Sequence, residues 1–206
     1  MGSRLERARE RLLPVFRRGL DSKLELLDRA RSRLESGDRE GLEAIRQVAH
    51  QLRGTGSSYG LPAVSVAGAA LEAAREEHVE RALGVLVRLL HEIKNEGEID
   101  PLRVLVFDGD GELAELLADG APVVLPAGSA DEARSYLRTL AFDCVVIAVG
   151  STNEDGPALL EELRATRDAA PCIAVGDAAS APDLVAPVDA DALSTAIRSV
   201  VERSAS

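Results

Sequence analysis

The sequence predicts a two-domain protein: an all-α four-helix bundle with a short extra N-terminal helix, then an α/β domain with a doubly wound parallel sheet of five strands. Three observations support this prediction. Apolar residues recur at helical spacing in the first half, short β-branched runs alternate with helical stretches in the second, and acidic charge is concentrated in the second half. The predicted domains cover residues 1–98 and 99–206.

Length and charge are consistent with this division. The chain has 206 residues, enough for two small domains with modest cores, and a formal net charge of -11. Residues 1–98 contain 17 Lys and Arg against 16 Asp and Glu, whereas residues 99–206 contain 7 against 19. The acidic second half and an aromatic content of 2% argue against nucleic-acid binding by charge or by base stacking.

Five helical segments are expected before the boundary. A short helix around Leu5–Leu13 precedes a longer amphipathic helix between Pro14 and Glu35. The tripeptide "SGD" then ends one helix and begins another, with Gly37 in the left-handed C-terminal position and Asp38 as the N-cap. The apolar positions expected to form the bundle core are Phe16, Leu20, Leu24, Leu27, Ala30, Leu34, Leu42, Ile45, Val48, Ala49, Leu52, Val64, Ala67, Leu71, Ala74, Leu83, Leu86, Val87 and Leu90.

The second half changes from helical to alternating periodicity. Five short runs are expected as strands: "RVLVFD", "APVVL", "CVVIAV", "CIAV" and "DLVA". Helical stretches separate most of them, and this alternation predicts parallel strands with crossover helices. Cys144 and Cys172 have neither metal-type nor redox-type spacing and are expected as buried core thiols. The absence of a secretory pattern and of a long apolar run predicts a cytoplasmic location.

The segment "DGDGE" at Asp108 invites a calcium-loop interpretation, which fails. The sixth loop position is Leu113 where glycine is needed, and the twelfth is Asp119 where glutamate is needed. Gly109 and Gly111 also do not complete a dinucleotide fingerprint, because Ala114 stands three positions beyond Gly111. We therefore expect neither a metal ion nor a cofactor.

His50 is separated from the apolar stripe of its helix. On a helical wheel that starts at Leu42, the stripe centres near 290° and His50 lies near 80°, at about 100° per residue, so the imidazole is expected to face water. The stretch Ala49–Gly60 contains no carboxylate. Gly54 costs about 1 kcal/mol of helix stability relative to alanine, which indicates a requirement for space beside the histidine.

This arrangement suits a phosphate carrier. A neutral imidazole is a competent nucleophile, nearby arginines stabilise an added phosphoryl group, and a carboxylate at the same place would repel it. A glycine gives the donor room for in-line approach. His50 is therefore the candidate phosphoacceptor. The candidate phosphate-stabilising or docking residues are Arg46, Gln47, Arg53, Gly54 and Ser57.

These residues resemble the histidine-containing phosphotransfer (HPt) domain of bacterial phosphorelays. The family pattern is a histidine followed by Leu, a basic residue and Gly, then a second Gly, with Leu-Glu closing the next helix. The matching positions are His50, Leu52, Arg53, Gly54, Gly60, Leu71 and Glu72. The usual lysine is arginine here, which keeps the charge and alters the geometry. The resemblance covers roughly Leu12–Leu90 and implies that the histidine accepts a phosphoryl group and passes it on.

The second half resembles the response-regulator receiver domain, a CheY-like, flavodoxin-like fold with strand order 2-1-3-4-5, over Leu102 to about Val201. Active receivers hold Mg²⁺ with acidic residues after the first strand and phosphorylate an aspartate at the end of the third. They also use a hydroxyl residue after the fourth strand and a lysine after the fifth. In this chain Asp108 is retained, while the four other positions are Gly109, Ala148, Gly176 and Ala186. The resemblance therefore implies a pseudo-receiver without phosphorylation chemistry.

The expected function is that of a phosphorelay intermediary. Without a kinase domain, the chain would act as a carrier, not as an enzyme that turns over substrate. Its expected partners are histidine kinases and response-regulator receivers, with no nucleic acid or membrane, and its expected state is a monomer or weak homodimer. The alternative is a non-catalytic adaptor or kinase inhibitor that uses both domains for docking. The pseudo-receiver's role is open between control of access to His50, partner recruitment and structural support.

Overall fold

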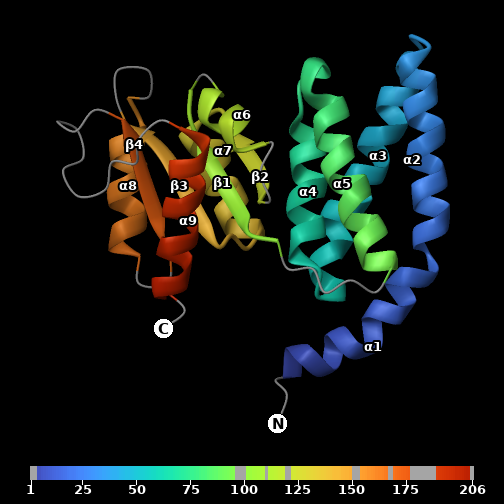
Figure 1. Ribbon diagram of the computed structural model, residues 1–206, viewed down its shortest axis with the longest axis horizontal. Helices are drawn as coiled ribbons and strands as arrows, with labels where there is room; N and C mark the ends of the chain where they lie inside the picture. The colour runs from blue at the N-terminus through green and yellow to red at the C-terminus, as the bar shows by residue number, and fades with distance from the viewer. Residues whose placement is uncertain are drawn as a thin grey trace. The chain divides into compact units, whose positions relative to one another are not determined.

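The computed structural model describes residues 4–95, 101–109, 111–118, 122–149, 154–166, 169–176 and 189–204. Contacts between residues divide the chain into two compact units, Met1–Asp100 and Pro101–Ser206, close to the boundary expected after residue 98. The first, here called the helical unit, is all helix in its regular structure, and the second, the sheet unit, combines strands and helices (Figure 1).

Four helices of the helical unit surround one core. The elements are α1 (Arg4–Arg18), α2 (Leu20–Glu35), α3 (Arg39–Gly56), η1 (Ser57–Tyr59), α4 (Pro62–Ala73), η2 (Glu76–His78) and α5 (Val79–Lys94). Helix α3 contacts both α2 and α4, and α5 contacts both α4 and α2. The side chains that fill the core include Leu20, Leu27, Ile45, Leu52, Leu71, Leu83, Leu86 and Leu90. These positions belong to the stripes that the helical periodicity predicted.

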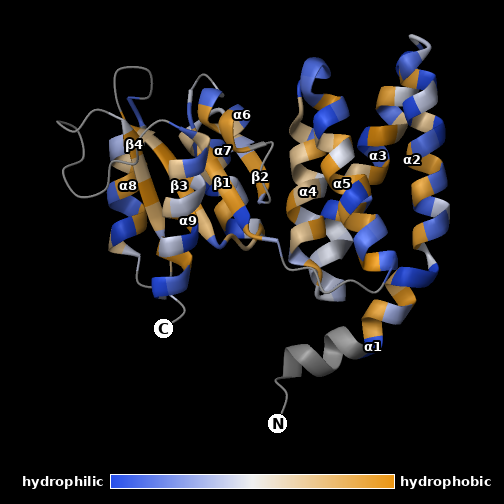
Figure 2. Cartoon of the chain, in the orientation of Figure 1, coloured by the Kyte–Doolittle hydropathy of each residue, from blue (hydrophilic) through white to orange (hydrophobic). Residues whose placement is uncertain are grey.

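Helix α4 differs in composition from its neighbours. It is apolar around most of its circumference, whereas α2 and α3 alternate apolar and hydrophilic faces (Figure 2). Its one charged residue is Glu72, in the last turn. A single carboxylate on an otherwise apolar helix indicates a specific partner for that carboxylate.

The first two helices divide at a different residue from the one expected. The prediction of a helix that begins at Pro14 is wrong, because α1 continues through Pro14 to Arg18 and the break lies at Gly19. The ring of Phe16 packs on Tyr59 with centroids 5.2 Å apart, and Arg17 Nε donates to the Ile93 carbonyl oxygen at 2.8 Å. These contacts anchor the end of α1. The apolar periodicity continues through the break at Gly19, so it could not predict the break.

The turn between α2 and α3 is as the sequence predicted. Gly37 has a φ of +84°, in the left-handed region, and its N–H donates to the Leu34 carbonyl oxygen at 2.9 Å. The Asp38 side chain accepts from the Glu40 N–H at 2.9 Å and so caps the first turn of α3. Both predictions are confirmed, and this turn sets where α3 begins.

The sheet unit contains a parallel sheet with the order β2-β1-β3-β4. Its strands are β1 (Arg103–Phe107), β2 (Val123–Ala127), β3 (Cys144–Val149) and β4 (Cys172–Gly176). Its helices are α6 (Glu112–Ala118), α7 (Ala130–Thr139), α8 (Gly156–Ala165) and α9 (Ala190–Ser204). The described residues therefore form four strands, not five. The run "DLVA", expected as the fifth, covers residues 183–186 and lies outside the described residues.

Alternation of side chains along the strands builds the core of the sheet unit. Val104 and Val146 pack with α6 and α9 in one apolar cluster, while α7 contacts β1 and β2, and α8 contacts β3 and β4. The parallel register pairs Val104 with Cys144 and Val146 with Ile173. In the described part of the chain, no helix is both long and apolar enough to cross a membrane.

The two cysteines are less alike than expected. Cys144 is buried as predicted, whereas Cys172 is only partly buried. Burial raises the pKa of Cys144 to about 12 and that of Cys172 to about 11. Because the thiolate is the reactive form, we expect both thiols to react slowly with iodoacetamide at pH 7.5 in the folded protein and rapidly in urea. Mass spectrometry over time measures this, and fast labelling of Cys144 in the folded chain would contradict it.

Candidate functional site

His50 lies in the middle of α3 and its side chain is 72% exposed. The opposite face of α3 is in the core, where Ile45, Ala49 and Leu52 have no exposed surface. The prediction that the imidazole faces water is therefore confirmed. The cap at Asp38 and the apolar stripe fix the rotation of α3, and this rotation turns residue 50 outward.

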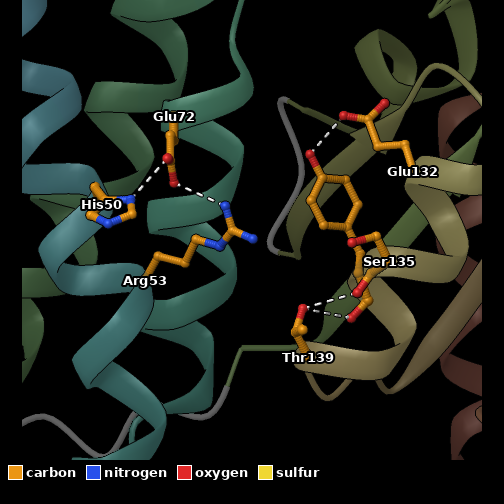
Figure 3. A network of polar contacts seen from close by, with 7 residues as sticks. His50, Arg53, Glu72, Glu132, Ser135 and Thr139 are labelled. Atoms are coloured by element: carbon orange, nitrogen blue, oxygen red, sulfur yellow. Dashed lines mark hydrogen bonds and ion pairs between the residues drawn. The ribbon is translucent and has the colours of Figure 1, made fainter.

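A carboxylate from a different helix contacts the imidazole. Glu72 Oε1 lies 3.0 Å from His50 Nδ1, and Glu72 Oε2 accepts from Arg53 Nη1 at 3.1 Å, as Figure 3 shows. The stretch Ala49–Gly60 contains no carboxylate, but the fold brings one to His50 from another helix, which the argument from neighbouring residues did not expect. Glu72 belongs to α4, so it is not among the residues that lie near His50 along α3. The Leu71-Glu72 pair, at the end of the following helix, was the feature of the sequence that could have indicated this contact.

The environment of Glu72 keeps its carboxyl group ionised. Partial burial raises its pKa, but the hydrogen bonds from His50 and Arg53 together outweigh burial, and the pKa lies below its ordinary value of 4.5. An ionised carboxylate only accepts hydrogen bonds, so the ring nitrogen that it contacts must donate. His50 therefore carries a proton on Nδ1, and when the ring is neutral the lone pair is on Nε2.

Helices α3 and α4 approach each other at a glycine next to this contact. A Cβ atom on Gly68 would lie 2.8 Å from the Ala49 carbonyl oxygen and 2.8 Å from the Arg53 nitrogen. The backbone of α4 thus lies directly against the turn of α3 that carries His50. Sequence reasoning missed Gly68, although a glycine inside an apolar helix is a signal of close packing.

Two of the predicted phosphate-stabilising residues are engaged elsewhere. Arg46 Nη2 donates to the Ala74 carbonyl oxygen at 3.3 Å, at the end of α4. The Ser57 hydroxyl lies 3.0 Å from the Ser65 hydroxyl, which also accepts from the Ser57 N–H at 2.8 Å. Ser57 is seven residues from His50, about 10 Å along the helix. The structure therefore brings Arg53 to the His50 contact through Glu72, and gives Arg46 and Ser57 structural hydrogen bonds.

The remaining two predicted positions lie on the exposed surface of α3. Gln47, one turn before His50, is exposed. Gly54 is exposed as well, and a Cβ atom there would meet nothing within 4 Å among the residues that the structure describes. Packing within the described chain therefore does not account for glycine at position 54, in contrast to Gly68.

The structure describes most of the sheet-unit positions that the resemblance compared with those of an active receiver. Asp108 is 3% exposed, and its Oδ2 accepts from the Leu113 N–H at 2.7 Å at the start of α6. Gly109 is exposed, and Ala148 lies within β3 opposite Val175. Ala186 lies outside the described residues. Over the described ranges, with their gaps, no group of three His, Cys, Asp or Glu side chains could hold a metal ion.

Gly176 ends β4 in a conformation that excludes a side chain. Its φ is +152°, and a Cβ atom would lie 1.8 Å from the Val149 carbonyl oxygen of the neighbouring strand. A serine or threonine at this position would require a different backbone conformation at the end of β4. Gly176, which the resemblance compared with the hydroxyl position of an active receiver, therefore has no room for a side chain in its present backbone conformation.

The helical unit thus presents an exposed histidine, on the side of a set of packed helices, with a carboxylate and an arginine beside it. Residues 11–96 match the model of the Hpt domain, and an Hpt domain is therefore found over this part of the chain. Hpt domains interact with histidine kinases and response regulators, and the match supports a role in histidine phosphotransfer within a phosphorelay. No curated protein and no solved structure matches the chain.

Proposed function

We propose that this protein is a phosphorelay intermediary in which His50 accepts a phosphoryl group on Nε2 and passes it to a response regulator. The observation that carries the proposal is the contact of Glu72 with His50 Nδ1 at 3.0 Å. This contact leaves the lone pair on the other ring nitrogen, on a side chain that is 72% exposed. A nucleophile must be both unprotonated and accessible to another protein, and Nε2 of His50 meets both requirements.

The transfer step is an in-line displacement at phosphorus. The Nε2 lone pair attacks the phosphorus of a donor, such as the acyl phosphate of a receiver aspartate, so that an N–P bond forms and the O–P bond breaks. The aspartate leaves as a carboxylate. Nδ1 keeps its proton, and the imidazole ring therefore becomes positively charged. The Glu72 carboxylate stabilises that charge at hydrogen-bond distance.

Arg53 balances the second charge in the site. The incoming phosphoryl group and the Glu72 carboxylate are both anionic, and they would repel each other without a cation. Arg53 donates to Glu72 at 3.1 Å, and both side chains are partly exposed, so the cation neutralises the carboxylate at the edge of the site. The carboxylate keeps the proton on Nδ1 and the lone pair on Nε2, and the arginine prevents an excess of negative charge near the incoming phosphoryl group.

Gly54 is proposed as the place where the partner protein approaches. Replacement by alanine is expected to stabilise α3 by about 1 kcal/mol, because alanine is the better helix former and the position is open. Replacement by leucine is expected to slow phosphoryl transfer severalfold, because the side chain fills the space beside His50. Thermal denaturation and transfer kinetics measure the two effects.

The matched control for this prediction is Gly84→Ala. Gly84 lies in α5, is exposed, and would give a Cβ atom no neighbour within 4 Å in the described part of the chain. It should gain similar stability and keep wild-type transfer. Unchanged transfer in Gly54→Leu would show that no partner needs this space.

For the sheet unit we propose a degenerate receiver that binds a partner or regulates access to His50. The parallel order β2-β1-β3-β4, the apolar side chain at Ala148 and the excluded side chain at Gly176 support it. We expect no labelling of the intact His50→Gln chain by acetyl phosphate, because the sheet unit offers no carboxylate at the acceptor position. Phosphate-affinity electrophoresis measures this, and stoichiometric labelling would overturn the proposal.

The direct test of the proposed function is the position of the phosphate. The intact chain is incubated with phosphorylated receivers and kinases, and the product is mapped by mass spectrometry at neutral pH. We expect a single acid-labile phosphate on His50. Phosphate on another residue would refute the assignment. Tight kinase binding without any phosphate would favour an adaptor instead.

A further inference from the structure

We infer that Gly68 is a positioning residue for the His50 site: its missing side chain lets α4 lie close enough to α3 for Glu72 to bridge His50 and Arg53. The consequence for phosphoryl transfer rests on the function proposed above. The consequence for the state of the imidazole ring does not, because it follows from the contact of the ring with an ionised carboxylate.

The atoms that face Gly68 are backbone atoms of the histidine's own turn. A Cβ atom on Gly68 would lie 2.8 Å from the Ala49 carbonyl oxygen, 2.8 Å from the Arg53 nitrogen and 3.2 Å from the Arg53 Cα. A flexible side chain could rotate away from such a contact, but these atoms cannot move without α3. Any side chain at position 68 therefore pushes the two helices apart at the level of His50.

Gly68 and Glu72 are coupled because they are one turn apart on the same face of α4. Relief of contacts at 2.8 Å requires a separation of roughly half an ångström or more, since carbon and oxygen or nitrogen pack at about 3.4 Å. The Glu72 carboxylate bridges His50 at 3.0 Å and Arg53 at 3.1 Å. Hydrogen bonds weaken beyond about 3.2 Å, so a displaced carboxylate loses one or both of these bonds.

A second glycine contact holds the same pair of helices further along. A Cβ atom on Gly56 would lie 2.7 Å from the Ser65 hydroxyl oxygen and 2.8 Å from the Ser65 nitrogen. Ser65 is fully buried, one turn before Gly68 in α4. The Gly56 contact anchors α3 and α4 at one level, and the Gly68 contact sets their separation at the level of Glu72.

The test compares Gly68→Ala with Gly84→Ala in the full chain. Gly84 is an exposed helical glycine, and a Cβ atom on it meets nothing within 4 Å across the described residues, so it controls for the change of residue type. The first readout is the ¹⁵N NMR signature of the His50 imidazole, assigned with His50→Gln. We expect Gly68→Ala to lose the preference for the Nδ1–H tautomer to the same extent as Glu72→Gln, and Gly84→Ala to retain it.

The second readout is a double-variant cycle on phosphoryl uptake. If Gly68 acts through Glu72, the Gly68→Ala/Glu72→Gln double variant should be no slower than Glu72→Gln alone. Losses that multiply would overturn the inference, as would a folded Gly68→Ala protein with the wild-type imidazole signature. Should no donor phosphorylate the wild type, the NMR result still tests the inference separately from the proposed function.

A further variant guards against unfolding of Gly68→Ala, which circular dichroism would reveal. Glu72→Asp keeps the glycine contact and withdraws the carboxylate by one methylene group. We expect it to shift the tautomer population toward that of Glu72→Gln. A wild-type signature in Glu72→Asp would show that the site tolerates displacement of the carboxylate, and would overturn the positional argument.

Discussion

Replacement of His50 by glutamine is expected to abolish phosphoryl uptake by the full chain. Glutamine offers no nucleophilic ring nitrogen, so no N–P bond can form. The side chain is 72% exposed, and loss of its contact with Glu72 should therefore change the free energy of unfolding by no more than about 1 kcal/mol. Labelling by a phosphorylated receiver or kinase, measured together with thermal denaturation, separates loss of chemistry from loss of fold.

The matched control for this prediction is His91→Gln. His91 is also an exposed helical histidine, in the last turn of α5, and it should be dispensable for labelling. Equal labelling of the wild type and of His50→Gln would contradict the assignment. Loss of labelling in His91→Gln would move the phosphoacceptor to α5.

Replacement of Glu72 by glutamine is expected to slow phosphoryl uptake by roughly tenfold. A hydrogen bond to a charged group contributes about 1.5–3 kcal/mol, and about 1.4 kcal/mol corresponds to a factor of ten in rate. We take the lower end because the His50 side of the contact is largely exposed. The amide of glutamine can donate or accept, so it neither selects the Nδ1–H tautomer nor stabilises positive charge on the ring.

Rapid-quench kinetics of uptake from a phosphorylated receiver measures this effect. Saturating donor is needed, so that a change in docking does not appear as a change in chemistry. Glu76→Gln is a suitable control, because Glu76 is an exposed glutamate in η2, just beyond α4. A wild-type rate in Glu72→Gln would show that the carboxylate has no part in the transfer step.

The same carboxylate is expected to make stability depend on pH. Burial raises the pKa of Glu72, but the bonds from His50 and Arg53 prevail and hold it below 4.5 in the folded protein. A depressed folded-state pKa stabilises the fold above the unfolded-state pKa, and this stabilisation is lost as the pH falls through the folded value. The stability difference between wild type and Glu72→Gln should therefore be fully present at pH 7, begin to fall near the ordinary glutamate pKa of about 4.3, and be lost as the pH passes through the lower pKa of the folded state. Urea denaturation across this range measures it, and a difference that grows toward low pH would contradict it.

Local pattern predicted much of this molecule. The spacing of Ile45, Ala49 and Leu52 indicated both the helix and its buried face, and the position of His50 opposite that face followed from the period of the helix. The Gly37–Asp38 turn was predictable because a left-handed glycine and a capping aspartate act through their own backbone. The strands β1 to β4 followed from short β-branched runs.

Other features depended on contacts that no local window contains. The break at Gly19 lies inside a continuous apolar period, and it is set by anchoring of Phe16 and Arg17 on distant elements. Arg46 lies on α3 as predicted, and Ser57 follows α3 as the first residue of η1. The Arg46 side chain bonds to Ala74 just after α4, and the Ser57 side chain bonds to Ser65 within α4. A helical wheel reports the direction of a side chain and not the partner that it meets.

The sequence by itself determined which helix carries the histidine and which way that histidine faces, because both depend on periodicity along one helix. Only the tertiary structure decided which ring nitrogen carries the proton, because Glu72 lies on another helix, 22 residues from His50 along the chain. That meeting depends on the separation of α3 and α4, which the missing side chain of Gly68 allows to be small. The distance between two helices is set by the side chains at their interface. These side chains come from both helices, so no single stretch of sequence determines the distance.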